Sequence, residues 1–195
     1  MIHEAFKNWQ AEILPAVVAQ YGDSDTVAAS ESWNDYTDAL CKDGELTGLQ
    51  YHYCPAHDDA MPADDDQERA HILREMGVAL ELTRVRMRPD AGDWHAGSQH
   101  FSFKVSRAGR EYSGHYSQGQ AHTAAPDLCD VLAALLMDSS GADQPFEDWA
   151  ADLGFDPDSR KAESVYNACG ETLAALERMF SADDLNDLRE LFADY

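Results

Sequence analysis

The chain has 195 residues, of which 44% are hydrophobic and 10% aromatic, so it can bury a core and is not a disordered acidic tail. Asp and Glu number 37 against 14 Lys and Arg, and the formal net charge of −23 opposes binding to nucleic acid or to anionic membranes. We therefore expect a cationic protein partner. Solubility or adaptation to high salt is the alternative reason for an Asp-rich, Lys-poor surface.

Three sequence features predict a cytoplasmic protein. No apolar stretch approaches the ~20 residues that span a bilayer. The first residues, Met1 to Glu4, lack the basic and apolar regions of a secretory signal. The four cysteines are widely spaced without a CxxC pair, which favours reduced thiols over a disulfide framework.

The charge divides the chain into three regions. Residues 1–77 carry a net charge of −12, residues 78–125 carry +2, and residues 126–195 carry −13. We expect a single domain over 1–195, in which two acidic helical lobes flank a central sheet.

The first region predicts helices. Apolar residues from Ala5 to Tyr21 recur near the helical period, and Pro15 predicts a kink or an early break within them. A second helix is predicted over Thr26–Lys42, where Asp43-Gly44 stops it. A third is predicted over Gln67–Met76, after an acidic stretch that suits a helix N-terminus.

The middle region predicts a small antiparallel sheet with strands over 83–88, 100–106 and 111–116. Residues 83–88 alternate strictly, which places Val85 and Met87 on one face with Phe101, Phe103 and Val105. In a regular strand, Leu80 and Leu82 would point to the face opposite to Val85 and Met87. A bulge or a change of the buried face is therefore needed near Thr83.

The last region returns to helices, which begin near Pro126, Phe146, Ser159 and Asp183. The complete pattern predicts an α+β fold, with N-terminal helices, a central three- or four-stranded antiparallel sheet and C-terminal helices.

Two stretches resemble segments of uncharacterised phage and prophage accessory proteins. The first is Phe146-Glu147-Asp148-Trp149, followed by Leu153 to Asp156 and by Asp158-Ser159-Arg160-Lys161-Ala162-Glu163, with Tyr166. The second is Trp33-Asn34-Asp35-Tyr36-Thr37-Asp38, followed by Leu40 to Gly44, with Gln50. The resemblance implies a mobile-element context, including an anti-restriction or anti-CRISPR role, and it supplies no catalytic residues.

Motifs for chemistry are sparse. The chain has no phosphate-binding glycine loop, no GxSxG and no HExxH, so we predict neither an enzyme nor a cofactor. His52, Cys54 and His57 are the weak candidates for zinc, with Cys41 upstream. Their spacing matches no standard finger or ribbon, and the favoured alternative is that Cys41 and Cys54 are buried thiols and the histidines are surface residues.

The alternating strand also predicts a row of arginines, Arg84, Arg86 and Arg88, beside Lys104. Such a face suits either phosphate binding or pairing with acidic groups of this or another protein. Because the net charge is −23, pairing with acidic groups is favoured.

The leading hypothesis is an inhibitor of a host defence nuclease complex, a CRISPR effector or a restriction enzyme. Its carboxylates would replace nucleic-acid phosphates in a groove lined by Lys and Arg. The predicted partner-binding residues are Asp58, Asp59, Asp64, Asp65 and Asp66 in the first lobe, and Asp143, Glu147, Asp148, Asp152, Asp156, Asp183, Asp184 and Asp187 in the second. The alternative is a phage or plasmid accessory protein that binds through the basic sheet face or a structural zinc. Neither hypothesis predicts direct binding to nucleic acid or membrane, and the oligomeric state is left open.

Overall fold

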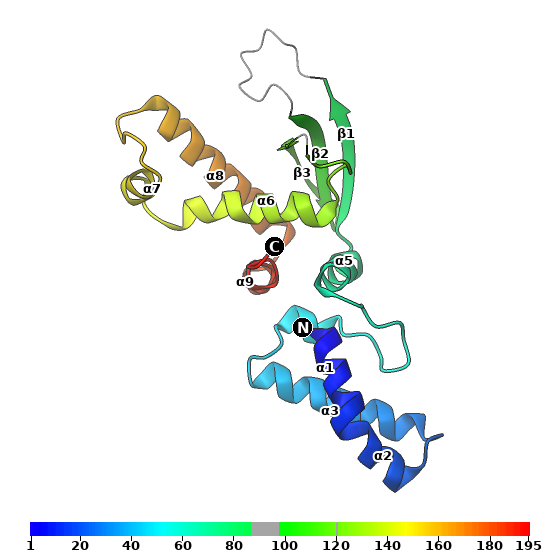
Figure 1. Ribbon diagram of the computed structural model, residues 1–195. Helices are drawn as coiled ribbons and strands as arrows, with labels where there is room; N and C mark the ends of the chain where they lie inside the picture. The colour runs from blue at the N-terminus through cyan, green and yellow to red at the C-terminus, as the bar shows by residue number, and fades with distance from the viewer. Residues whose placement is uncertain (87–97, 120) are drawn as a thin grey trace. The chain divides into compact units, whose positions relative to one another are not determined.

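The computed structural model describes residues 1–86, 98–119 and 121–195 (Figure 1). The chain forms two compact units, unit 1 with Met1–Met76 and Asn186–Asp194, and unit 2 with Gly77–Leu185 and Tyr195. Helices precede and follow a three-stranded antiparallel sheet, which confirms the predicted α+β fold. Met87 and Arg88 lie outside the described residues.

The elements follow one another in this order: α1 (Ile2–Asn8), the π-helical turn η1 (Trp9–Ile13), α2 (Leu14–Tyr21), α3 (Thr26–Lys42), α4 (Gly48–His52), α5 (Asp65–Glu75), β1 (Ala79–Val85), β2 (Gln99–Arg107), β3 (Arg110–Gln118), α6 (Leu128–Ser140), the 3-10 turn η2 (Gly141–Asp143), α7 (Phe146–Asp152), α8 (Arg160–Met179) and α9 (Ala182–Leu191). Within the described ranges, no helix is long and apolar enough to cross a membrane.

The first helical segment of unit 1 passes Pro15 without ending. Proline lacks an N–H and its ring clashes with the carbonyl four residues earlier, so an ordinary α-helix is disfavoured there. The chain instead widens into η1, and the Leu14 N–H bonds to the carbonyl of Trp9, five residues back. Helical structure then resumes as α2, so the π-helical turn takes the place of the predicted kink or break.

An aromatic cluster forms the core between this segment and α3. The Trp9 and Trp33 rings are 5.4 Å apart, and Phe6 meets Trp33 edge-on at 5.4 Å. Both indoles are nearly fully buried, and both N–H groups find acceptors. Trp9 donates to Ser32 Oγ at 3.1 Å and Trp33 donates to the Pro55 carbonyl at 3.0 Å. The cluster therefore fixes η1 against α3 with its polar atoms satisfied.

A buried carboxylate on α5 ties three parts of unit 1 together. Glu68 is fully buried. Its Oε1 accepts from Gln50 Nε2 at 2.7 Å, and its Oε2 lies 3.3 Å from His3 Nδ1 and accepts from the His3 N–H at 3.4 Å. These contacts offset the cost of burying the charge, and they connect α1, α4 and α5.

The sheet of unit 2 has the order β1-β2-β3, and its register runs from Ala79 opposite Ser106 to Val85 opposite His100 without a bulge. Leu80 and Leu82 lie opposite Val105 and Phe103, so they share the buried face with those residues. The same register puts Arg84 opposite Phe101.

Two predictions about β1 are therefore wrong. Val85 lies on the face opposite to Phe101, and Arg84 does not share a face with Lys104, which pairs with Glu81 in the register. The physical reason is that half-buried Leu80 and Leu82 determine which side chains of β1 share a face with Val105 and Phe103, because partial burial of two leucines outweighs that of Val85 alone.

Helices α6 and α8 pack against each other, and α8 packs against β3. Their buried residues include Leu132, Leu136 and Leu176, and Tyr112 Oη on β3 lies 3.2 Å from Thr172 Oγ1 on α8. The α8 helix begins at the predicted cap, where Ser159 Oγ accepts from the Lys161 N–H at 3.2 Å.

Candidate partner-binding surface

The predicted acids of α7 and its flanking turns lie together in sequence and are all exposed. We call them the acidic α7 surface, which comprises Asp143, Glu147, Asp148, Asp152 and Asp156. Asp148 and Asp152 stand four residues apart on the helix, so their side chains share a face, with Cβ atoms about 5–6 Å apart. Asp158, which was not among the predicted binding residues, is also exposed and extends the acidic stretch.

A small aromatic core holds α7 in place. Trp149 is 3% exposed, and its ring stacks on Phe155 at 5.2 Å with an interplanar angle of 10°. The Tyr166 ring of α8 lies 5.5 Å from Trp149, and its hydroxyl donates to the Gln144 carbonyl at 2.8 Å. Gly154, with φ at 68°, ends the helix in the left-handed conformation. Glu147, Asp148 and Asp152 therefore stand on a helix that is fixed by packing against α8.

Cationic residues are rare in the sequence around this surface. Lys and Arg are absent from residues 111–159. Within the part of the chain that the structure describes, Glu147, Asp148 and Asp152 form no ion pair. Exposed Arg160 and Lys161 mark the end of the stretch at the start of α8. The acidic α7 surface thus has carboxylates available for an external cation.

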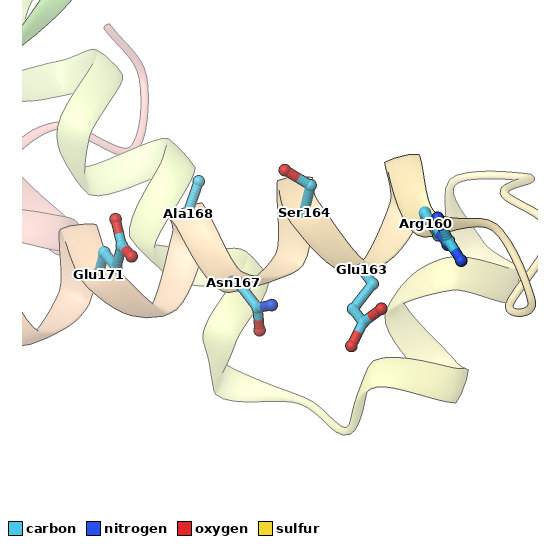
Figure 2. Close-up of a pocket in the computed structure, with 6 residues that line it drawn as sticks. All are labelled: Arg160, Glu163, Ser164, Asn167, Ala168 and Glu171. Carbon is cyan, nitrogen blue, oxygen red and sulfur yellow. The ribbon is translucent and has the colours of Figure 1, made fainter.

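Figure 2 shows the neighbouring depression on α8, whose lining side chains all come from that helix. They comprise Arg160, Glu163, Ser164, Asn167, Ala168 and Glu171. The depression is open, carries both signs of charge and receives no side chain from a second element. It lacks the converging polar groups of a small-molecule site.

The acids predicted in the first lobe are exposed, but most of them have partners within unit 1. The Asp64 side chain accepts from the Gln67 N–H at 2.9 Å and caps α5. Asp66 lies 3.1 Å from Arg69 Nη1, and Asp65 lies 3.7 Å from His3 Nδ1. Asp58 is 3.9 Å from His57 Nδ1. Of these carboxylates, Asp66 thus lies beside an arginine of its own helix, whereas Glu147, Asp148 and Asp152 have no Lys or Arg partner among the described residues.

The predicted acids of the C-terminal helix divide into one exposed and two partly buried residues. Asp183 is exposed. Asp184 accepts from Arg107 Nη1 at 2.9 Å, and Asp187 accepts from the Leu49 N–H at 2.8 Å at the start of α4. The expected exposure of Asp184 and Asp187 is wrong, because both carboxylates satisfy internal donors.

The candidate zinc residues His52, Cys54 and His57 are held by other interactions. His57 Nδ1 lies 3.1 Å from Ser30 Oγ, and the exposed His52 ring meets Tyr53 edge-on at 4.6 Å. Burial, together with the Glu68 carboxylate, raises the pKa of the Cys54 thiol to about 12. Among the described residues, no group of three His, Cys, Asp or Glu side chains is arranged to hold a metal ion.

The basic sheet face is also not assembled as predicted. Lys104 Nζ lies 2.7 Å from Glu81 Oε1 and 3.9 Å from Glu111 Oε2, so acids of the adjacent strands surround it. Arg84 lies on the other face, and Arg86 follows the end of β1. Comparison with protein-family models, curated proteins and solved structures finds no match for this chain.

Proposed function

We propose that this protein inhibits a host defence nuclease complex by occupying its nucleic-acid-binding surface. The observation that carries the proposal is that Glu147, Asp148 and Asp152 of the acidic α7 surface are exposed on a packed helix and form no ion pair with any residue that the structure describes. The target is a CRISPR effector or a restriction enzyme, because these complexes bind DNA or RNA through grooves lined by Lys and Arg.

Electrostatics supports this function. DNA carries one negative charge per ~1.7 Å of helix axis, and a groove that binds it must supply a matching row of cations. Four of the five residues of the acidic α7 surface are Asp, whose short side chain loses less rotamer freedom than Glu when it is fixed. Carboxylates held on a packed helix can therefore bind these cations at a low entropic cost.

The resemblance of Phe146–Trp149 and Asp158–Glu163 to phage accessory proteins supports the same function. It implies a mobile-element context, and the proposed site of action is therefore the cytoplasm of the host cell. The residues that carry the resemblance include Glu147 and Asp148 of the proposed surface. In this role the protein acts by binding, without a catalytic step or a cofactor.

The proposal is tested with two charge-neutralised variants of the full chain. The α7 variant carries Glu147→Gln, Asp148→Asn, Asp152→Asn and Asp156→Asn. The α5 variant carries Asp58→Asn, Asp59→Asn, Asp65→Asn and Asp66→Asn and removes the same number of charges. Each variant is titrated into DNA-cleavage reactions with purified CRISPR effectors and restriction enzymes.

We expect the parent to inhibit at least one complex and the α7 variant to need at least tenfold more protein. One exposed ion pair contributes only about 0.2–1 kcal/mol, so four together account for a change of this size. The α5 variant should inhibit within about threefold of the parent. Equal inhibition by all three proteins would refute the role of the acidic α7 surface.

A further inference from the structure

Helix α2 is apolar but buries none of its residues. Its sequence, Leu14 to Tyr21, contains no charged residue, yet no residue of the helix is classed as buried. Val18 is 37% exposed and Tyr21 is 56% exposed. Apolar helices normally bury such residues, so α2 is a candidate surface for another molecule to cover.

Exposed residues lie around most of α2, and its two larger exposed apolar residues, Val18 and Tyr21, stand three residues apart and so share a face. Pro15, Val18 and Ala19 stand at i, i+3 and i+4, so they share a face, and Tyr21 lies a further three residues beyond Val18. We call these four residues the α2 face. Helix α2 also packs against α3, and its partly buried Leu14, four residues before Val18, joins the aromatic core. Figure 1 shows α2 and the start of α3 at the end of their hairpin, away from α4 and α5.

The α2 face is already held in shape before a partner binds. The Trp9–Trp33 contact and the Trp9 bond to Ser32 fix η1 immediately before α2. Gly22, with φ at 93°, ends the helix. The Asp25 carboxylate then starts α3 by accepting from the Ala28 N–H at 3.0 Å. Binding would therefore need little ordering of the backbone.

The charge around the α2 face indicates which partner fits. Lys and Arg are absent from residues 8–41, whereas this range contains six acids. Glu12 and Asp23, which directly flank the uncharged stretch, are both exposed. A second copy of this chain would bring the same acids against one another, and an anionic membrane would repel them. A protein surface that is apolar at its centre and bordered by Lys or Arg complements both features.

We propose that the α2 face is a docking surface for a protein whose apolar contact patch is bordered by Lys and Arg side chains. The helix would lie in a groove or against a helix of that partner, with Val18 and Tyr21 as its apolar anchors. This surface is distinct in sequence and in unit from the acidic α7 surface, so the inference holds whether or not the protein inhibits a nuclease.

The test uses a fluorescently labelled helical peptide with a leucine stripe flanked by lysines as the probe. Two peptides of the same length serve as controls, one with serines in place of the leucines and one with glutamates in place of the lysines. Binding to the full chain is measured by fluorescence anisotropy. The test variant carries Val18→Gln and Tyr21→Gln, which retain good or neutral helix formers at exposed positions. The control variant carries Met137→Gln and Val165→Gln, at exposed apolar sites of unit 2.

We expect the leucine–lysine peptide to bind the parent and the control variant equally and the α2 variant at least tenfold more weakly. The serine and glutamate peptides should bind the parent at least tenfold more weakly than the leucine–lysine peptide. Unchanged binding to the α2 variant would overturn the proposal, since the net charge would then explain the affinity. If the double variant does not fold, Val18→Gln alone should lower the affinity about threefold.

Two further outcomes would assign the α2 face to a different occupant and overturn the proposal. One is a concentration-dependent dimer of the parent in light scattering that the α2 variant does not form. The other is binding to phosphatidylcholine vesicles that the α2 variant loses. Neither is expected.

Discussion

Replacing Trp149 by Ala should show whether inhibition requires carboxylates held on a folded α7 or only the net negative charge of the chain. The substitution leaves every carboxylate in the chain, but it removes the side chain that anchors α7. Trp149 is 3% exposed, and its ring lies 5.2 to 6.1 Å from those of Phe155, Tyr166 and Phe146. Truncation of a buried tryptophan costs about 3–5 kcal/mol.

That loss should act mainly on α7. The cluster around Trp149 includes Ala150 and Ala162 and is separate from the aromatic core of unit 1. A helix of seven residues has little stability without tertiary packing. We therefore expect α7 to unfold locally in Trp149→Ala, and amide hydrogen exchange should show lost protection over residues 146–152 with protection retained in β2 and α3.

Inhibition of the nuclease complex should fall at least tenfold in Trp149→Ala at unchanged net charge. Trp149→Phe keeps an aromatic ring in the cluster and should stay within about threefold of the parent. Leu153→Ala, at a position that is 60% exposed at the end of α7, serves as the second control. Full inhibition by a Trp149→Ala protein whose α7 amides exchange freely would refute the need for a fixed surface.

Three further predictions concern the supports of the fold. Glu68→Gln removes a buried carboxylate oxygen that accepts a hydrogen bond from Gln50. Urea denaturation should therefore show a loss of about 1–3 kcal/mol in the free energy of unfolding. An unchanged free energy would contradict a stabilising role for the hydrogen bonds around Glu68. Gly114→Ala should lower the free energy of unfolding by about 1–3 kcal/mol, because the added Cβ would lie 2.6 Å from Cζ of Phe103. A variant with the melting temperature of the parent would show that the Phe103 ring moves away without cost. The Cys54 thiol, with its pKa raised to about 12, should react with iodoacetamide at pH 8 far more slowly than free cysteine does. Because the unfolded thiol ionises near pH 9 and the folded thiol does not, this group should lower stability as pH rises from about 9 to 12; Cys54→Ser should lose that part of the pH dependence.

The local signals of the sequence predict the helices well. The predicted helix Thr26–Lys42 has the same bounds in the structure, because Asp25 caps its start and the turn at Asp43-Gly44 follows its end. Ser159 likewise begins α8 at the predicted place. The prediction omitted α4, although Thr47 and Gln50 form a capping box whose spacing is visible in the sequence.

Features set by tertiary contacts were harder to predict. The pairing of β1 with β2 determines which side chains of β1 share a face with Phe103 and Val105. The alternation of residues 83–88 alone does not show this pairing. Asp187 is held by an N–H from Leu49, far away in the sequence, so composition alone could not distinguish it from exposed Asp183. For the candidate surface, the sequence predicted the acids of α7 but not that Trp149 and Tyr166 fix them.

The most direct measurement is a competition experiment between the protein and DNA on a purified defence complex that the protein inhibits. Labelled DNA is bound to the complex, and its displacement by the parent, the α7 variant and the α5 variant is followed by anisotropy at several salt concentrations. If carboxylates replace phosphates, the parent should displace DNA competitively and bind more weakly as salt rises, because exposed charges are screened over ~10 Å at 0.1 M. The α7 variant should need at least tenfold more protein than the parent or the α5 variant. A ternary complex with DNA still bound, or equal displacement by all three proteins, would contradict nucleic-acid mimicry by the acidic α7 surface.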